Sequence, residues 1–275
     1  MEIRYPSERE IPSLRKLWKQ AFGDTDAYLD LFFTRGFDRE KSLCAMDGDQ
    51  VAAAMYWLDA EYGGKQIAYL YAVATHPAHR GLGLSGRLLA WADDHFRTLN
   101  IPAVTTVPAT PSLHNFFAAN GFRECFCHDE LLPTPNAHPL PCTLHPISPA
   151  GYSTFREEFL SHSPHIRLPE DAIRYQDGCS RISGGGLYAA EAPSGRCILC
   201  AEGMEDGTLL VKELLGQPSA CDEIMGELHR ILPGFSGICR RPGSGIPFGM
   251  LKWLDKFRAD VWNWHDSAYL GLAFD

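Results

Sequence analysis

Residues 74–89 read ATHPAHRGLGLSGRLL, and this stretch decides the fold of the chain. The preceding residues 66–73 are rich in β-branched and aromatic side chains, which predicts a strand. From Leu84 to Phe96 apolar residues recur at helical spacing, which predicts a helix. A strand, a glycine-containing turn and a helix together favour anion binding, because glycines let backbone N–H groups converge and the helix N-terminus adds unpaired donors. The guanidinium of Arg80 adds a positive charge to the same turn.

The turn resembles the acetyl-CoA-binding signature of the GNAT acetyltransferase superfamily, Arg/Gln-x-x-Gly-x-Gly/Ala. Arg80, Gly83 and Ser85 fall on its three defined positions, and the serine departs from the pattern while keeping a small side chain. The turn has neither the Lys of a Walker loop nor the full pattern of a dinucleotide loop. Downstream, a predicted strand at 102–107 and a predicted helix that Ser112 would cap are similar to the family's next segments.

The resemblance implies that acetyl-CoA binds in the first half of the chain as the acyl-donor substrate. The backbone of the fourth strand would pair with the pantetheine arm, and one of its N–H groups would polarise the thioester carbonyl. The turn would hold the pyrophosphate, Thr110 falls where the family often has a cofactor-binding Asn, and Phe117 would line the arm. The cofactor-binding residues carried over in this way are Val73, Ala74, Thr75, Arg80, Gly81, Leu82, Gly83, Leu84, Ser85, Thr110 and Phe117.

The groups for proton transfer depart from the family's common pattern. Phe117 stands where relatives often have a tyrosine that protonates the departing thiolate, and Tyr69 stands where many have a carboxylate. We rank Tyr69 first as the catalytic group, ahead of Tyr71 on the same strand face and of His76. Asp275 is a further candidate, because the chain also resembles tandem acetyltransferases of the enhanced-intracellular-survival type, in which a C-terminal carboxylate takes part in proton handling.

The chain is predicted to be α+β, with two GNAT-like units that each have a mostly antiparallel sheet flanked by helices. The first unit, residues 1–134, has the family's order of strands and helices. Residues 133–141 hold four prolines, which predicts a linker. Residues 142–275 repeat the pattern, with a loop at 240–249 and an edge strand at 268–274. An unrelated α+β domain is the alternative for this second half.

The second unit is predicted to be degenerate. Gln217-Pro218 stands where a glycine-rich cradle would be needed, and proline lacks the amide N–H that holds a phosphate. We therefore expect one CoA site per chain, in the first unit.

The composition is that of a globular protein, with 275 residues, 45% hydrophobic residues and a net charge of −9. This acidity argues against nucleic-acid binding, which needs basic patches, and mildly favours a cationic acceptor. Because there is neither a leader-like N-terminus nor a long apolar run, we expect a cytoplasmic protein with no membrane partner. The nine irregularly spaced cysteines predict reduced core residues rather than a metal site. No sequence signal indicates an oligomeric state.

The leading functional prediction is an acyl-CoA-dependent N-acyltransferase, with acetyl-CoA as donor and the amine of a small molecule or peptide as acceptor. The alternative is a non-catalytic acyl-CoA-binding sensor or assembly module. It is motivated by Phe117 and Tyr69, which replace the usual proton-transfer groups. Release of free CoA in the presence of amines would distinguish the two.

Overall fold

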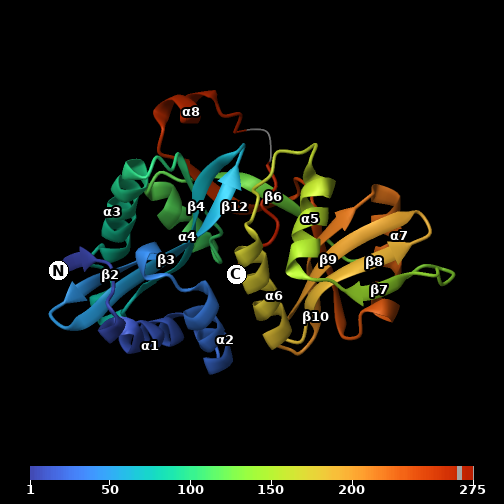
Figure 1. Ribbon diagram of the computed structural model, residues 1–275, viewed down its shortest axis with the longest axis horizontal. Coiled ribbons are helices and arrows are strands. Elements are labelled where there is room, and N and C mark those ends of the chain that lie inside the picture. The colour runs from blue at the N-terminus through green and yellow to red at the C-terminus, as the bar shows by residue number, and fades with distance from the viewer. Residues whose placement is uncertain (265–267, 275) are drawn as a thin grey trace. The chain divides into compact units, whose positions relative to one another are not determined.

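The computed structural model describes residues 1–264 and 268–274 (Figure 1). Its backbone contacts group the chain into two compact units, called here the first and the second unit. The first unit holds residues 1–124 and 250–263, and the second holds residues 125–249 and the chain from Trp264 onward. Each unit combines helices with a mostly antiparallel sheet, as the sequence predicts.

One sheet forms the frame of the first unit. Its strands are β1 (Glu2–Arg4), β2 (Ser42–Asp47), β3 (Gln50–Tyr62), β4 (Lys65–Thr75), β5 (Ala103–Thr106) and the end of β12 (Ile246–Trp253). They are arranged in the order β1-β2-β3-β4-β5-β12. Neighbouring strands are antiparallel except for β4 and β5, which are parallel. Two parallel strands need a crossover connection, and residues 76–102 supply it.

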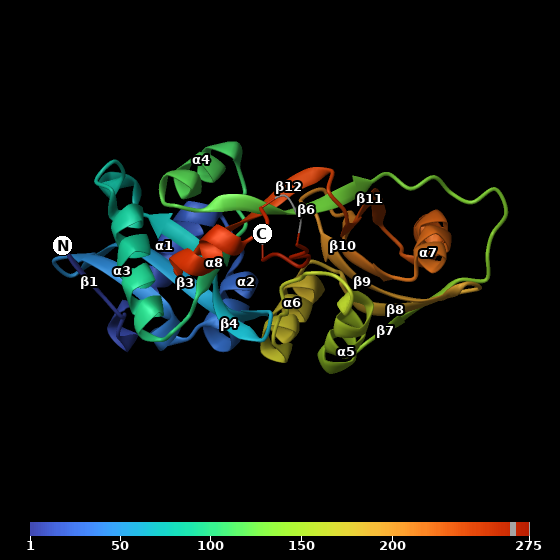
Figure 2. The same ribbon diagram turned by 90° about the horizontal axis from the view of Figure 1, so that it is seen from above.

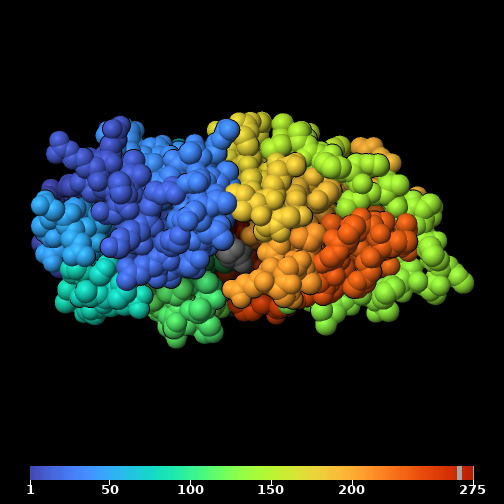
Figure 3. All heavy atoms as spheres, turned by 90° about the horizontal axis from the view of Figure 1, so that it is seen from below, coloured from blue at the N-terminus to red at the C-terminus, as the bar shows by residue number. Residues whose placement is uncertain are grey.

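Helices complete the first unit. They are α1 (Ile11–Phe22), α2 (Asp26–Leu31), α3 (Leu84–Thr98), α4 (Pro111–Ala119) and α8 (Lys256–Val261), with α3 and α4 visible in Figure 2. α1 begins with Pro12 in its first turn and ends at Gly23, which has a left-handed φ of 77°. α2 continues into one π-helical stretch at Phe32–Gly36. The blue atoms of Figure 3 show the surface that the N-terminal residues form.

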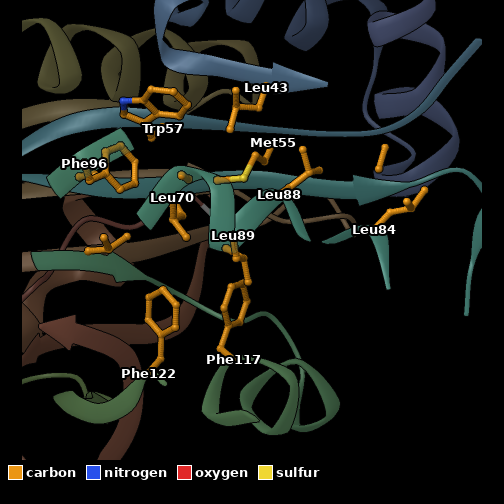
Figure 4. Packing of buried hydrophobic residues seen from close by; sticks show 14 of the residues in the cluster. Leu43, Met55, Trp57, Leu70, Leu84, Leu88, Leu89, Phe96, Phe117 and Phe122 are labelled. Carbon is orange, nitrogen blue, oxygen red and sulfur yellow. The ribbon is translucent and has the colours of Figure 1, made fainter. Parts of the chain in front are cut away.

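The two faces of this sheet carry different cores. On the α3 face the core is mainly aliphatic, and Figure 4 shows Leu84, Leu88 and Leu89 of α3 packed toward the strands. On the face of α1 and α2 the core is aromatic: the ring of Trp18 lies 4.3 Å from that of Phe32, between centroids. Burying large apolar side chains on both faces fixes the sheet between two helix layers.

The last strand of the first unit comes from a distant part of the sequence. The end of β12 pairs with β5, and the hydroxyl of Thr105 donates to the carbonyl oxygen of Met250 at 3.0 Å. The ammonium of Lys252 donates to Asp93 on α3 and lies 5.5 Å from the ring centroid of Phe122. The predicted loop at 240–249 is corrected in part, because β12 already begins within it.

The second unit has its own set of strands and helices. Its strands follow the order β6-β11-β10-β9-β8-β7, with only β10 and β11 parallel among the neighbouring pairs that the structure describes. Its strands are β6 (Arg123–Leu131), β7 (Thr143–Pro146), β8 (Gly186–Ala192), β9 (Gly195–Gly203), β10 (Leu209–Gly216) and β11 (Phe235–Pro242), and its helices are α5 (Pro149–Leu160), α6 (Glu170–Ile182) and α7 (Pro218–Ile231).

Two expectations for the second half need adjustment. The described residues 268–274 are buried but form no regular strand, since Ala268 and Tyr269 make only isolated bridges and Gly271 has a left-handed φ of 74°. The predicted edge strand there is therefore wrong. The predicted boundary at 133–141 also differs from the division by contacts, because β6 pairs with β11 and the end of β12 pairs with β5.

Candidate functional site

A bulge interrupts β4 near its C-terminal end. Ala54 of β3 lies opposite Ala74, whereas Tyr56 lies opposite Tyr71, so β4 carries one extra residue between these pairs. Ala72 has a φ of 50°, in the left-handed region that a non-glycine residue rarely adopts. Such bulges re-aim neighbouring backbone groups, and backbone strain of this kind gathers at functional sites.

β4 and β5 separate just before this bulge. The parallel pairing joins Ala68 to Val104 and Tyr69 to Thr105, and β4 then continues to Thr75 without a further described pair to β5. The hydroxyl of Thr106 still reaches the carbonyl oxygen of Leu70, at 3.4 Å. The predicted pantetheine-pairing residues 73–75 therefore lie on a stretch of β4 that is paired with β3 alone.

The turn between β4 and α3 is open toward solvent. Gly81 and Gly83 have left-handed φ angles of 79° and 69°, and a Cβ atom placed on either would meet nothing within 4 Å. Arg80 and Leu82 are exposed beside them. Gly83 is the N-cap of α3 and brings no capping side chain. The first-turn N–H groups of a helix have no intrahelical acceptor, so a helix start of this kind can bind an anion.

Two side-chain contacts fix the turn at its ends. The hydroxyl oxygens of Thr75 and Ser85 lie 2.7 Å apart and join the last residue of β4 to the first turn of α3. Nε2 of His79 lies 3.1 Å from the carboxylate of Asp47 at the end of β2. His79 is only 9% exposed. This second contact could not be predicted from the sequence, because no local pattern links residues 32 positions apart.

The remaining cofactor candidates lie on α4. The hydroxyl of Thr110 accepts a hydrogen bond from the backbone N–H of Leu113 at 3.4 Å, so Thr110 is the N-cap. This corrects the predicted cap, Ser112, which lies within the first helical turn. Phe117 is 5% exposed, and its ring centroid lies 5.3 Å from that of Phe122 (Figure 4).

The proton-transfer candidates lie on β4 and just after it. Tyr69 is 2% exposed and sits opposite both β3 and β5. Tyr71 is 7% exposed, and its hydroxyl oxygen lies 2.5 Å from that of Tyr28. His76 accepts a hydrogen bond from the backbone N–H of Ala78 at 3.2 Å. Asp275 lies outside the described residues.

The part of the chain that the structure describes was also searched for a metal site, for exposed cysteines and for membrane-spanning helices. Within residues 1–264 and 268–274, no group of three or more His, Cys, Asp or Glu side chains is placed to hold a metal ion. Eight of the nine cysteines are buried, and burial raises the pKa of the Cys239 thiol to about 12. None of the described helices has the length and apolar character needed to cross a membrane.

Known proteins resemble this chain in sequence over its first half and in fold over most of its length. Residues 2–119 match the family model of the GNAT acetyltransferase domain. The sequence has no match among curated proteins. A GCN5-related N-acetyltransferase from Anabaena variabilis shares 16% identity, covers 94% of this chain and 74% of its own, and superposes with a TM-score of 0.68.

Two further solved structures show a similar likeness over more than nine tenths of this chain. A probable N-acyltransferase from Enterococcus faecalis has 15% identity, covers 92% of this chain and 72% of its own, and gives a TM-score of 0.68. Eis1 from Mycobacterium abscessus has 12% identity, covers 93% of this chain and 74% of its own, and gives a TM-score of 0.64. Residues 2–119 therefore match the GNAT acetyltransferase domain model, and the chain has the fold of these solved structures.

Proposed function

We propose that the first unit transfers the acetyl group of acetyl-CoA to the amine of a small-molecule or peptide acceptor. The single observation that carries this proposal is the combination, on one strand, of the bulge at Ala72 and the open glycine turn that follows Thr75. The turn and the first turn of α3 offer backbone N–H groups and the charge of Arg80 to a pyrophosphate. Residues 73–75 offer a strand edge to the pantetheine arm.

Acetyl transfer from a thioester to an amine needs few catalytic groups besides those that bind CoA. Attack of a neutral amine on a thioester creates a negatively charged oxygen, and a backbone N–H fixed near the bulge would stabilise that charge. Holding donor and acceptor in one geometry supplies much of the rate enhancement. The amine must lose a proton and the thiolate must gain one, and Tyr69 is the group that the sequence proposes for this task.

The experiment that tests the proposal measures free thiol released from acetyl-CoA by the purified protein with a panel of amines, including cationic ones. We expect turnover that requires both substrates, together with one bound CoA per chain in a calorimetric titration. Tight CoA binding without turnover on any amine would overturn the enzyme proposal and favour the non-catalytic sensor. Two equivalent CoA sites would overturn the assignment to the first unit alone.

A further inference from the structure

We infer that the thiols of Cys197 and Cys221 form a reversible disulfide on exposure to a peroxide, which makes this pair a redox modification site of the second unit. Cys197 lies on β9 and Cys221 lies on α7, and both are free thiols in the structure (Figure 1). Their sulfur atoms are 3.7 Å apart. The inference is independent of acetyl transfer, because both residues belong to the second unit.

The backbone beside Cys197 leaves room for its sulfur. Cys197 pairs with Gly216 on β10, and a Cβ atom on Gly216 would lie only 2.6 Å from that sulfur. A side chain at position 216 would therefore displace the sulfur from its place beside Cys221. The two sulfurs of a disulfide are about 2.0 Å apart, so they must approach each other by about 1.7 Å from their present separation. Changes in the side-chain torsions of the two cysteines, with small backbone shifts, provide a movement of this size.

The two thiols differ in reactivity. Cys221 lies in the first turn of α7, where the helix amide groups favour a thiolate. The hydrogen bond with Cys197 and the positive charge of Arg241 lower the pKa of the Cys221 thiol, although burial and Asp222 act in the opposite direction. The same hydrogen bond, together with burial, raises the pKa of Cys197. Cys221 is also the more exposed residue, at 6% against 0%. Cys221 is therefore the thiol that reacts with the oxidant, and Cys197 is the thiol that closes the disulfide.

The reaction with hydrogen peroxide is balanced. The Cys221 thiolate attacks one oxygen, the O–O bond breaks, and Cys221 becomes a sulfenic acid. The other oxygen takes up the proton that the thiol lost and leaves as water. The sulfur of Cys197 then attacks the sulfur of Cys221, so that the S–S bond forms and the S–O bond breaks. The second oxygen leaves as water with the proton of Cys197. The two thiols lose two electrons, which reduce the peroxide, and the product joins β9 to α7.

Cys200 provides a matched control on the same strand. It lies three residues after Cys197 and is fully buried, but its sulfur lies 3.4 Å from the hydroxyl oxygen of Ser180 on α6. Trypsin cleaves after Arg and Lys, so it places Cys197 and Cys200 together in the peptide 197–212. Substitution of each cysteine therefore shows which of the two is linked to Cys221.

The test treats the folded protein with hydrogen peroxide, blocks the remaining thiols with iodoacetamide and maps the tryptic peptides by mass spectrometry. In the wild-type protein we expect residues 197–212 to be joined to residues 213–230, with the loss of two of the nine thiols. Dithiothreitol should separate the two peptides. The link should persist in Cys200→Ala and should be absent from Cys197→Ala and Cys221→Ala.

Two results would overturn the inference. One is a wild-type protein that keeps all nine thiols or gains oxygen on its cysteines without forming the link. The other is a link that persists in a folded Cys197→Ala protein, because Cys200 would then be the partner of Cys221. Circular dichroism shows whether each variant is folded, and peptide mapping of the wild-type protein tests the inference without any variant. Neither result bears on acetyl transfer, which is measured separately.

Discussion

The two units connect a strand to the following helix in different ways. In the first unit, β4 ends at Thr75 and α3 begins at Leu84, so eight residues form the turn. In the second unit, β10 ends at Gly216 and α7 begins at Pro218, so Gln217 alone forms the connection. Both strands have a parallel neighbour, which is β5 for β4 and β11 for β10.

The space around the two connections differs as well. A Cβ atom on Gly83 would meet nothing within 4 Å, whereas one on Gly216 would lie 2.6 Å from the sulfur of Cys197. The side-chain oxygen of Gln217 is in turn 3.0 Å from a Cβ position on Gly195. The two units therefore share a strand order but differ in the length and openness of this connection, and we propose that this difference decides which unit binds a phosphate.

The largest expected effect comes from closing the open turn. Gly83→Val should weaken CoA binding at least 100-fold by calorimetry, because the added side chain would occupy the open space beside the turn into which we propose that the pyrophosphate binds. Gly63→Val is the matched control, since Gly63 has a similar φ of 54° and equally open surroundings in the β3–β4 hairpin. A folded Gly83→Val protein that binds CoA like wild type would contradict the assignment of the turn.

A substitution in the tightly packed connection between β10 and α7 should change the stability of the protein but not its CoA affinity. Gly216→Ala should lower the free energy of unfolding by about 1–3 kcal/mol, because the new methyl group overlaps Cys197 and lies 2.8 Å from the carbonyl oxygen of Arg196. CoA affinity should not change. Urea unfolding and CoA titration of the same sample measure both quantities, and weaker CoA binding in Gly216→Ala would show that the second unit contributes to the donor site.

A smaller effect is expected from removing the contact between His79 of the open turn and Asp47 of β2. Asp47→Ala removes the acceptor of His79 and should weaken CoA binding about 3–10-fold, the net contribution of one typical hydrogen bond. Asp49→Ala, in the same hairpin and exposed, is the control. Equal CoA affinities of the two variants would show that the turn holds its shape without this contact.

The smallest effect concerns Glu227 of α7, which accepts hydrogen bonds from the segment that contains Asn136 and Leu140. Side-chain hydrogen bonds from Asn136 and Arg230, and the backbone N–H of Leu140, lower the pKa of Glu227 to about 2. A carboxylate with a lowered pKa stabilises the fold above its usual pKa, and this contribution is lost as the pH falls from about 4.5 toward about 2. The Tm of Glu227→Gln should therefore lie below that of wild type at pH 6.

The difference between these two Tm values should shrink as the pH approaches 3, because wild-type Glu227 then becomes protonated as well. Thermal unfolding followed by circular dichroism over this range provides the measurement. A Tm difference that stays constant with pH would mean that the glutamine disturbs packing rather than charge.

Local features of the fold were predictable from the sequence, and distant contacts were not. The strand, the glycine turn and α3 are encoded in adjacent residues, so their positions follow from periodicity and glycine placement. β12 was missed because Pro247 and Gly249 interrupt a strand pattern, while its pairing depends on β5, far away in the sequence. The contacts of Asp47 with His79 and of Tyr28 with Tyr71 likewise join separate elements. No spacing in the sequence predicts them.

The origin of β12 has a consequence for synthesis of the protein on the ribosome. β5 ends at Thr106, and its partner Met250 is made only after another 143 residues have been added. During that interval the hydrogen-bonding edge of β5 that will receive β12 has no final partner, and open strand edges invite pairing with other chains. Lys252, which contacts Asp93, arrives at the same late stage. The first unit is thus completed by the end of a strand that is translated after residues 125–249 of the second unit.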